Sequence, residues 1–327
     1  MSVLGHSRPL VICPGGMMTC SSAEVMAAAG YQRGVVHTDP AVMAAVSCGI
    51  AESTGFDNVG VPFCMTVEAE AMGARVDLGS IEVEPLVTRY AAQTLAEVAD
   101  LPLPDPMIAG RMPVVLEALR VLTVASRDRV VTGNVIGPVS LLTSLIEPGV
   151  AYRAMREDPE AVHAALERVV DVVAHFAQAQ VRAGARLVMV AEPSGTGDIL
   201  GPTWFEAFAA PYLARVTRAV LDADAEVVLH ICGDVRPIIE RVSVIPMTAF
   251  SFESVLDVSE ISESWPDGRF MGNVSTRLLQ NSSPERIRSV VDGLVSRGID
   301  IVAPACGIPV AAPIANVRAL ASAVHAR

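Results

Sequence analysis

Three residues of the kind that bind soft metal ions follow two apolar segments of the sequence. His230 and Cys232 stand two positions apart, directly after the run Val227–Leu229. Cys306 follows a second apolar run, Ile301–Ala305. Residues i and i+2 of a β-strand point to the same face, so His230 and Cys232 can converge on one point. One histidine and two cysteines leave a fourth coordination position open, as catalytic zinc sites do. The pattern therefore predicts a zinc site at His230, Cys232 and Cys306.

A zinc ion held by one histidine and two cysteines favours a particular chemistry. The two thiolates cancel the charge of the ion, so a bound water is acidified less than at a site of three histidines. Such a site suits a third thiol, whose ordinary pKa of about 8.5 it would lower. The sequence also contains no HExxH segment of the kind found in zinc hydrolases. Alkylation of a thiol is therefore favoured over hydrolysis of an ester or a peptide.

The candidate metal ligands would be positioned by a fold of eight strands, since the sequence contains eight short apolar runs separated by helical patterns. Alternating strands and helices with eight strands predict a (β/α)8 TIM barrel as a single domain over residues 1–327. A doubly wound α/β sheet is the alternative, but no glycine-rich dinucleotide fingerprint follows the first run. The predicted strands are Leu10–Cys13, Asn58–Pro62, Arg129–Asn134, Arg186–Ala191, Glu226–His230, Thr248–Phe252, Arg269–Gly272 and Asp300–Ala305.

The helical patterns include one long helix with clear start and stop signals. Asp158 can cap it, Pro159 suits its first position, and Gly184 can end it. Residues 64–127 hold few strand signals, so a helical cap beside the barrel opening is possible there. The other expected helices lie at Pro202–Val220, Pro237–Val242, Pro284–Arg297 and Ala312–His325.

Polar residues at the C-terminal ends of the predicted strands complete the expected site, because barrel enzymes carry their active sites there. Glu192 is the predicted catalytic residue, as a carboxylate that fills the fourth metal position until substrate displaces it, with a plain hydrogen-bonding role as the alternative. Asn134, Glu253 and Asn273 are predicted to bind substrate, with capping of the following loops as the alternative. The remaining cysteines are expected to be small apolar residues, and the remaining histidines surface or helix-face residues.

Composition excludes several classes of function. The formal net charge of −12 argues against nucleic-acid binding, which needs basic surfaces. All 24 basic residues other than histidine are arginines, so a Schiff-base lysine is absent. No run of about 18 apolar residues predicts a membrane span, and Met1–Pro9 lacks the apolar core of a signal peptide. The expectation is a cytoplasmic protein that does not enter a membrane.

Beyond these patterns, the sequence resembles the uroporphyrinogen decarboxylase superfamily, specifically its methylcobalamin:coenzyme M methyltransferase branch. The resemblance covers nearly the whole chain, and the HxC…C set at His230, Cys232 and Cys306 matches the zinc signature of this branch. The other segments that carry the resemblance are Val61–Glu70, Ala191–Asp198, Pro211–Tyr212, Gly272–Val274 and Ala303–Ile308.

The resemblance implies a (β/α)8 barrel and a specific reaction. A methyl group would pass from a methylated corrinoid, methylcobalamin or a separate corrinoid protein, to a zinc-activated thiol such as coenzyme M. The cofactor would be Zn²⁺, the methylcorrinoid would be the methyl donor, and the partners would be the corrinoid protein and a small thiol.

Three alternatives remain open at this level. Some relatives transfer the methyl group to tetrahydrofolate, whose acceptor nitrogen needs no thiol-binding zinc. Uroporphyrinogen decarboxylases carry an arginine-rich N-terminal motif for a substrate with many carboxylates, whereas Arg8–Met17 contains one arginine. A non-catalytic module that binds corrinoid or metal is the alternative from another class. The intact ligand set favours methyl transfer to a thiol.

Overall fold

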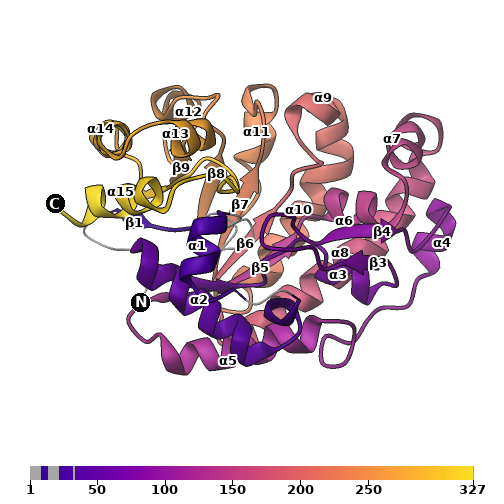
Figure 1. The fold of residues 1–327 in the computed structure, drawn as a ribbon. Helices are drawn as coiled ribbons and strands as arrows, with labels where there is room; N and C mark the ends of the chain where they lie inside the picture. Colours follow the sequence, from indigo (N-terminus) through magenta and orange to yellow (C-terminus); the bar gives the residue numbers. More distant parts are fainter. Residues whose placement is uncertain (1–8, 14–21, 32–33, 327) are drawn as a thin grey trace.

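A computed structural model describes residues 9–13, 22–31 and 34–326, and its eight long-range parallel strands form one sheet (Figure 1). The strand order is β1-β10-β9-β8-β7-β6-β5-β2, with every neighbouring pair parallel. Helices alternate with the strands and surround the sheet, as in a TIM barrel. The strands are β1 (Leu10–Val11), β2 (Asn58–Val61), β5 (Val130–Ile136), β6 (Leu187–Ala191), β7 (Glu226–Ile231), β8 (Ala249–Phe252), β9 (Phe270–Val274) and β10 (Ile301–Pro304).

All eight predicted strands are present, and the predicted barrel is confirmed. Three strands continue beyond their predicted ends: β5 to Ile136, β7 to Ile231 and β9 to Val274. Asn134 and Asn273 therefore lie inside strands, and their prediction as strand-end residues is corrected. The sequence obscured these ends because the apolar side chains that follow each asparagine continue the buried strand.

The two ends of the sheet meet where β1 lies against the start of β2. Val11 donates its N–H to the Asp57 carboxylate at 2.8 Å, and the Asp57 N–H returns a bond of 2.8 Å to the Val11 carbonyl. Cys13 donates to the Asn58 side chain at 2.9 Å. Side chains from the β2 end thus take part in closing the barrel.

The helices lie around the strands, and their caps follow the sequence signals. The Asp158 side chain accepts a bond from the Ala161 N–H at 3.2 Å, and Gly184 has a positive φ of 113° just after the helix, so the predicted long helix is confirmed. The α-helices are α1 (Ala23–Ala28), α2 (Pro40–Thr54), α3 (Val67–Ala71), α4 (Leu95–Asp100), α5 (Met112–Ala125), α6 (Pro138–Leu145), α7 (Pro148–Glu157), α8 (Pro159–Arg182), α9 (Gly197–Trp204), α10 (Ala210–Leu221), α11 (Ile239–Val242), α12 (Val258–Ser264), α13 (Thr276–Asn281), α14 (Pro284–Ser296) and α15 (Ile314–His325). Shorter turns of other helix types are η2 (Val35–His37), η3 (Phe205–Ala209) and η4 (Arg236–Ile238).

Side-chain alternation along the strands decides which residues face the barrel interior. On β7, Val228 belongs to an apolar cluster inside the barrel, so His230, two positions later, also faces inward. The same spacing places Ser251 of β8 and Asn273 of β9 on the interior face, one layer above the apolar cluster. The interior cluster is Leu10, Ile12, Leu187, Met189, Val228, Ala249, Met271, Ile301 and Ala303.

The segment predicted as a possible cap contains more than helices. Between α3 and α4 it forms an antiparallel pair, β3 (Arg75–Asp77) and β4 (Leu86–Arg89), outside the main sheet. Its last helix, α5, packs against α2, β2 and β5 in the position of a barrel helix. Only the part from α3 to α4 is therefore additional to the repeating barrel pattern. Within the described residues, no helix has the length and apolar character needed to cross a bilayer.

Candidate metal centre

The structure brings His230, Cys232 and Cys306 together at the C-terminal ends of β7 and β10. Their potential ligand atoms all lie within 4.8 Å of one another. His230 Nε2 is 3.2 Å from Cys232 Sγ, and the two sulfurs are 3.6 Å apart. His230 is buried and the two cysteines are half-buried, so the group is open on one side.

These distances fit a tetrahedral metal ion. Two sulfurs bound at about 2.3 Å with tetrahedral angles would lie roughly 3.8 Å apart, close to the separation found here. A disulfide would require an S–S bond of about 2.0 Å, so the two cysteines are free thiols. A histidine with two cysteines is a donor set typical of zinc, and three ligands leave one position for a substrate.

The two thiols influence each other's protonation. The hydrogen bond between them lowers the pKa of Cys306 and raises the pKa of Cys232. One sulfur is therefore readily present as a thiolate, with the other holding the proton. The carboxylates of Glu253 and Glu192 raise the pKa of Cys232 further, so negative charge lies close to this group.

Ser251 of β8 contacts His230, and Glu253, which follows β8, contacts the turn after Cys232. Ser251 Oγ lies 3.0 Å from His230 Nδ1, which leaves Nε2 directed at the sulfurs. Glu253, directly after the strand, accepts a bond of 3.0 Å from the Gly233 N–H with its Oε2. Gly233 follows Cys232 and has a positive φ of 72°, so the turn after the ligand is held by Glu253. Sequence reasoning missed Ser251, although its i−2 spacing from Glu253 places both on one face.

The Glu192 carboxylate is held by the N-terminal end of α6. It accepts bonds from Val139 N–H at 2.9 Å, from Ser140 N–H at 2.9 Å and from Gly195 N–H at 3.1 Å, as well as from the Ser140 hydroxyl. Burial raises the pKa of Glu192 to about 7, and these donors oppose the shift. Both oxygens thus have partners in the protein, and Glu192 lies outside the group of mutually close ligand atoms. Its role as fourth ligand stays a prediction.

Glycine residues make room for this carboxylate. A Cβ atom on Gly137 would lie 2.4 Å from Glu192 Oε2, and one on Gly195 would lie 2.8 Å from Glu192 Cγ. Either side chain would displace Glu192, since real contacts are not that short. Gly137 and Gly195 therefore leave the space that the Glu192 side chain occupies.

The two predicted asparagines make bonds within the protein. Asn134 donates from Nδ2 to the Pro62 carbonyl at 3.4 Å, which links β5 to the end of β2. Asn273 donates from Nδ2 to the carbonyls of Glu253 at 3.3 Å and Leu256 at 2.7 Å. Asn273 therefore fixes the loop that carries Glu253. Substrate binding by Asn134, Glu253 and Asn273 stays a prediction.

Comparison with known proteins assigns the chain to a family. The model of the uroporphyrinogen decarboxylase (URO-D) family matches residues 5–327. The chain belongs to the URO-D family. The family predicted from the sequence is thereby confirmed.

Within the URO-D family, the chain is similar to methyltransferases. Methylcobamide:CoM methyltransferase MtaA of Methanosarcina barkeri is 29% identical over 304 residues, which cover 92% of this chain and 88% of that protein. Methylcobamide:CoM methyltransferase MtbA of Methanosarcina acetivorans is 25% identical over 300 residues, covering 91% and 88%. The solved structure of a methyltransferase from Methanosarcina mazei superimposes with a TM-score of 0.90 at 27% identity and covers 98% of this chain and 94% of that one.

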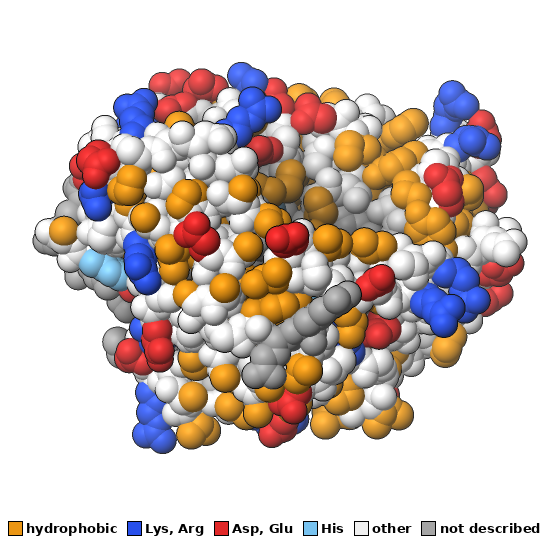
Figure 2. Space-filling view, in the orientation of Figure 1, with side chains coloured by type: hydrophobic (Ala, Val, Ile, Leu, Met, Phe, Trp, Pro, Cys, Tyr) orange, Lys and Arg blue, Asp and Glu red, His pale blue; other side chains and the backbone are white. Residues whose placement is uncertain are grey.

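The surface of this URO-D family member is hollowed on the face drawn in Figure 2. Hydrophobic side chains line the edge of the hollow, and acidic side chains lie near it. The exposed hydrophobic residues in segments that follow barrel strands include Ile199, on α9, and Val255, in the loop after β8. A surface of this kind favours a bulky, largely apolar ligand over a highly charged one.

A second polar cluster follows β2 and was not predicted as part of the site. Arg111 donates to Cys64 Sγ at 3.3 Å and to Thr66 Oγ1 at 2.9 Å, and it pairs with Glu70 at 2.6 Å. All the bonded groups except Glu70 are buried. The segment Val61–Glu70, which carried part of the family resemblance, thus contributes Cys64 and Thr66 to a buried polar cluster at the end of β2. The sequence did not reveal this cluster, because Arg111 is far from Cys64 and Thr66 along the chain.

Glu68, in the same segment, gives a prediction for stability. Its carboxyl is 1% exposed, accepts the Ile136 N–H at 3.0 Å, and has a pKa that burial raises from the ordinary 4.5 to about 7. The folded chain therefore binds this proton more tightly than the unfolded chain, and the unfolding free energy falls as pH rises from about 4.5 to 7. The expected loss from this group is on the order of 3 kcal/mol. Glu68→Gln keeps an acceptor without ionising, so it should lose less stability over this range.

Urea unfolding at pH 5 and pH 8 measures this difference. Glu117→Gln serves as the control, because Glu117 is exposed on α5 and pairs only with Arg120 in the described contacts. The control should follow the unchanged protein. An equal fall in stability for Glu68→Gln and the unchanged protein would contradict the assignment.

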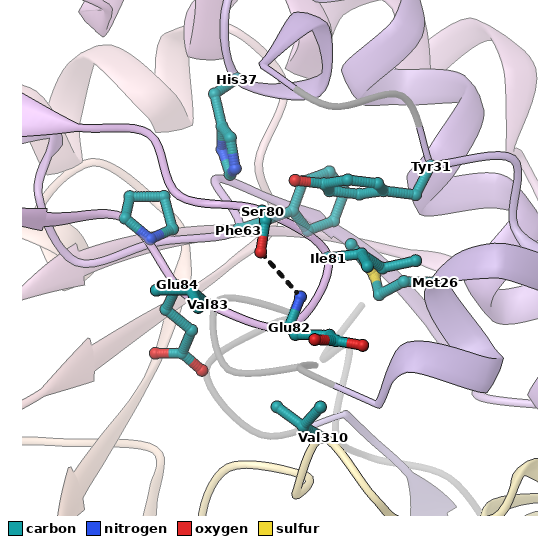
Figure 3. A pocket seen from close by; sticks show the side chains of 11 residues that line it. Met26, Tyr31, His37, Phe63, Ser80, Ile81, Glu82, Val83, Glu84 and Val310 are labelled. Atoms are coloured by element: carbon teal, nitrogen blue, oxygen red, sulfur yellow. Dashed lines mark hydrogen bonds between the residues drawn. The ribbon is translucent and has the colours of Figure 1, made fainter.

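A small cavity lies near the same segment and is separate from the metal ligands (Figure 3). Its volume of about 30 Å³ is room for about one water molecule. His37 lines it, together with Tyr31, Phe63 and the loop between β3 and β4. His37 is 3% exposed, and burial followed by the charge of Arg111 lowers its pKa to about 4. The prediction that His37 is a surface or helix-face residue is wrong, because η2 turns its ring inward.

Proposed function

We propose that this protein transfers a methyl group from a methylated corrinoid to a thiol, with Zn²⁺ held by His230, Cys232 and Cys306. The observation that carries the proposal is the convergence of these three ligand atoms within 4.8 Å at the opening of a URO-D barrel. The similarity to methylcobamide:CoM methyltransferases over nine-tenths of the chain supports it. Coenzyme M is the thiol that those relatives' names suggest as the acceptor.

The donor set fits the metal and its task. When bound, zinc would lower the pKa of the acceptor thiol and keep its sulfur at the open position. Cys232 and Cys306 supply the two negative charges that leave the site nearly neutral. His230, held by Ser251, presents Nε2 to the same point.

The carboxylates around the site add negative charge beside Cys232 and raise the pKa of its thiol. Glu253 holds the turn after Cys232, and of the two carboxylates its charge has the larger effect on the pKa of that thiol. Because Glu192 is held by four donors, Glu253 is the less constrained of the two carboxylates and the better candidate for contact with the open position. We propose that Asn134 and Asn273 shape the substrate-binding space around the open coordination position.

The methyl donor would lie over the barrel opening. The sulfur–carbon bond forms while the carbon–cobalt bond breaks, and the cobalt leaves with the electron pair as cobalt(I). Alignment of sulfur, carbon and cobalt removes much of the entropic barrier. The net charge of −12 gives no sign of a basic docking surface, so we propose that shape and apolar contact bind the corrinoid or its carrier protein. We also propose that the protein acts in the cytoplasm, where thiols stay reduced.

Uroporphyrinogen decarboxylation is the second candidate, because the family takes its name from that reaction. The arginine-rich motif expected of a decarboxylase would fall in Arg8–Met17, half of which lies outside the described residues, and this segment contains one arginine. A substrate with many carboxylates would meet Glu192 and Glu253 beside the ligand group, and these repel it. The charges near the site therefore favour methyl transfer.

Consumption of methylcobalamin tests the proposal directly. We expect zinc-loaded protein to demethylate methylcobalamin when a thiol such as coenzyme M is present, and to do so far more slowly with tetrahydrofolate or without an acceptor. The corrinoid absorbance and the methylated product measure the transfer. Transfer to tetrahydrofolate alone would replace the thiol assignment, and zinc binding without any transfer would favour a non-catalytic module.

A further inference from the structure

His230 has a hydrogen-bonding partner on each ring nitrogen, and the two partners differ in kind. Nδ1 lies 3.0 Å from Ser251 Oγ, and Nε2 lies 3.2 Å from Cys232 Sγ. Ser251 is fully buried and His230 is 7% exposed, so water is a poor substitute for either partner. The β7–β8 register pairs His230 with Ser251 directly, which fixes this contact through the backbone.

The protonation of the ring must differ between the metal-free and the loaded site. A metal ligand needs a lone pair on Nε2, so the ring proton then resides on Nδ1. Without a metal, the ring N–H is a stronger donor than a thiol, and a neighbouring sulfur is the available acceptor. The metal-free arrangement therefore places the proton on Nε2, with Nδ1 accepting.

A hydroxyl group is the partner that satisfies both arrangements. It donates its O–H to Nδ1 in the metal-free site, and it accepts the Nδ1–H in the loaded site. A carbonyl or a carboxylate could serve only the second arrangement. An alanine would leave Nδ1 unpaired in both, at a buried position.

We propose that Ser251 is a positioning residue that lets His230 change tautomer when the metal binds. In this change one N–H bond breaks at Nε2, one forms at Nδ1, and the proton exchanges through solvent. The hydroxyl of Ser251 rotates from donor to acceptor. This inference rests on the metal site of the proposed function and adds a residue that holds its histidine ligand.

The histidine tautomer can be read directly in the unchanged full-length protein. Long-range ¹⁵N–¹H correlation spectra should show His230 as the Nε2–H tautomer without metal and as the Nδ1–H tautomer with one equivalent of zinc. Comparison with His230→Gln identifies the signal. The same tautomer in both spectra would overturn the proposal while leaving zinc binding intact. Failure to bind zinc at all would overturn it together with the proposed function.

Variants of Ser251 test the consequence for affinity. Competition with a chelator should show zinc bound 10- to 100-fold more weakly by Ser251→Ala, as is typical when a partner of a metal-binding histidine is removed. Ser251→Thr keeps a hydroxyl and should bind zinc within about threefold of the unchanged protein. Ser47→Ala is the control, because Ser47 is a buried serine whose hydroxyl bonds Gly60, remote in sequence from the ligands. Equal affinity of Ser251→Ala and Ser47→Ala would overturn the proposal. If Ser251→Ala does not fold, the tautomer spectra of the unchanged protein decide it.

Discussion

Cys306→Ala is expected to bind zinc at least about a hundredfold more weakly than the unchanged protein, and to lose methyl transfer with it. Removal of a partner of a metal ligand typically costs 10- to 100-fold in affinity, and removal of the ligand itself should cost more. Only two protein ligands would remain, His230 and Cys232, whose atoms are 3.2 Å apart. The lost thiolate would also leave the site with one uncompensated positive charge.

Metal content after dialysis against a chelator, measured beside methylcobalamin consumption, checks this expectation. Cys48→Ala is the matched control, because Cys48 is a free, half-buried cysteine on α2 that bonds Ser126 at 3.3 Å and takes no part in the ligand group. The control should retain zinc and activity. Full retention of zinc by Cys306→Ala would refute the three-ligand site.

The barrel could be predicted from the sequence because its signals are local. Each of the eight strands is a short and largely apolar run, and helix signals such as Asp158–Pro159 stand between these runs. The convergence of His230 with Cys232 followed from strand alternation alone. The addition of Cys306, 74 residues later, followed from barrel geometry, because strand ends meet at one side.

The remaining features depend on contacts that no local pattern specifies. The four donors to Glu192 come from α6 and from the loop after β6. The strand-end position of Glu192 therefore could not reveal that its carboxylate is hydrogen-bonded within the protein. Asn273 was predicted to face substrate, yet its amide bonds the Glu253–Leu256 loop. Arg111 reaches the segment after β2 from the start of α5. Such contacts between distant segments set the direction of each polar side chain, and the sequence shows only that polar residues are present.

The second large expected effect is a change in the coordination shell of the metal when the acceptor thiol binds. If a thiol fills the position left open by His230, Cys232 and Cys306, its sulfur should enter the coordination shell of the metal. X-ray absorption of the zinc-loaded protein should then show two sulfurs without acceptor and three at a saturating thiol concentration. A thiol has an ordinary pKa of about 8.5, so binding as a thiolate near neutral pH should release about one proton.

The proton release can be measured in a weakly buffered solution with a pH indicator, and its sign follows from the pKa change. Below the ordinary thiol pKa the free acceptor carries its proton, so release should be nearly complete at pH 7 and should diminish above about pH 9. An alcohol of the same size as the thiol is the control ligand and should release no proton. Methylcobalamin consumption with saturating thiol, while the spectrum keeps two sulfurs, would show that the acceptor reacts without binding at this site. The three converging ligands would then hold the metal for some other purpose, since an open position that never receives the acceptor cannot activate it.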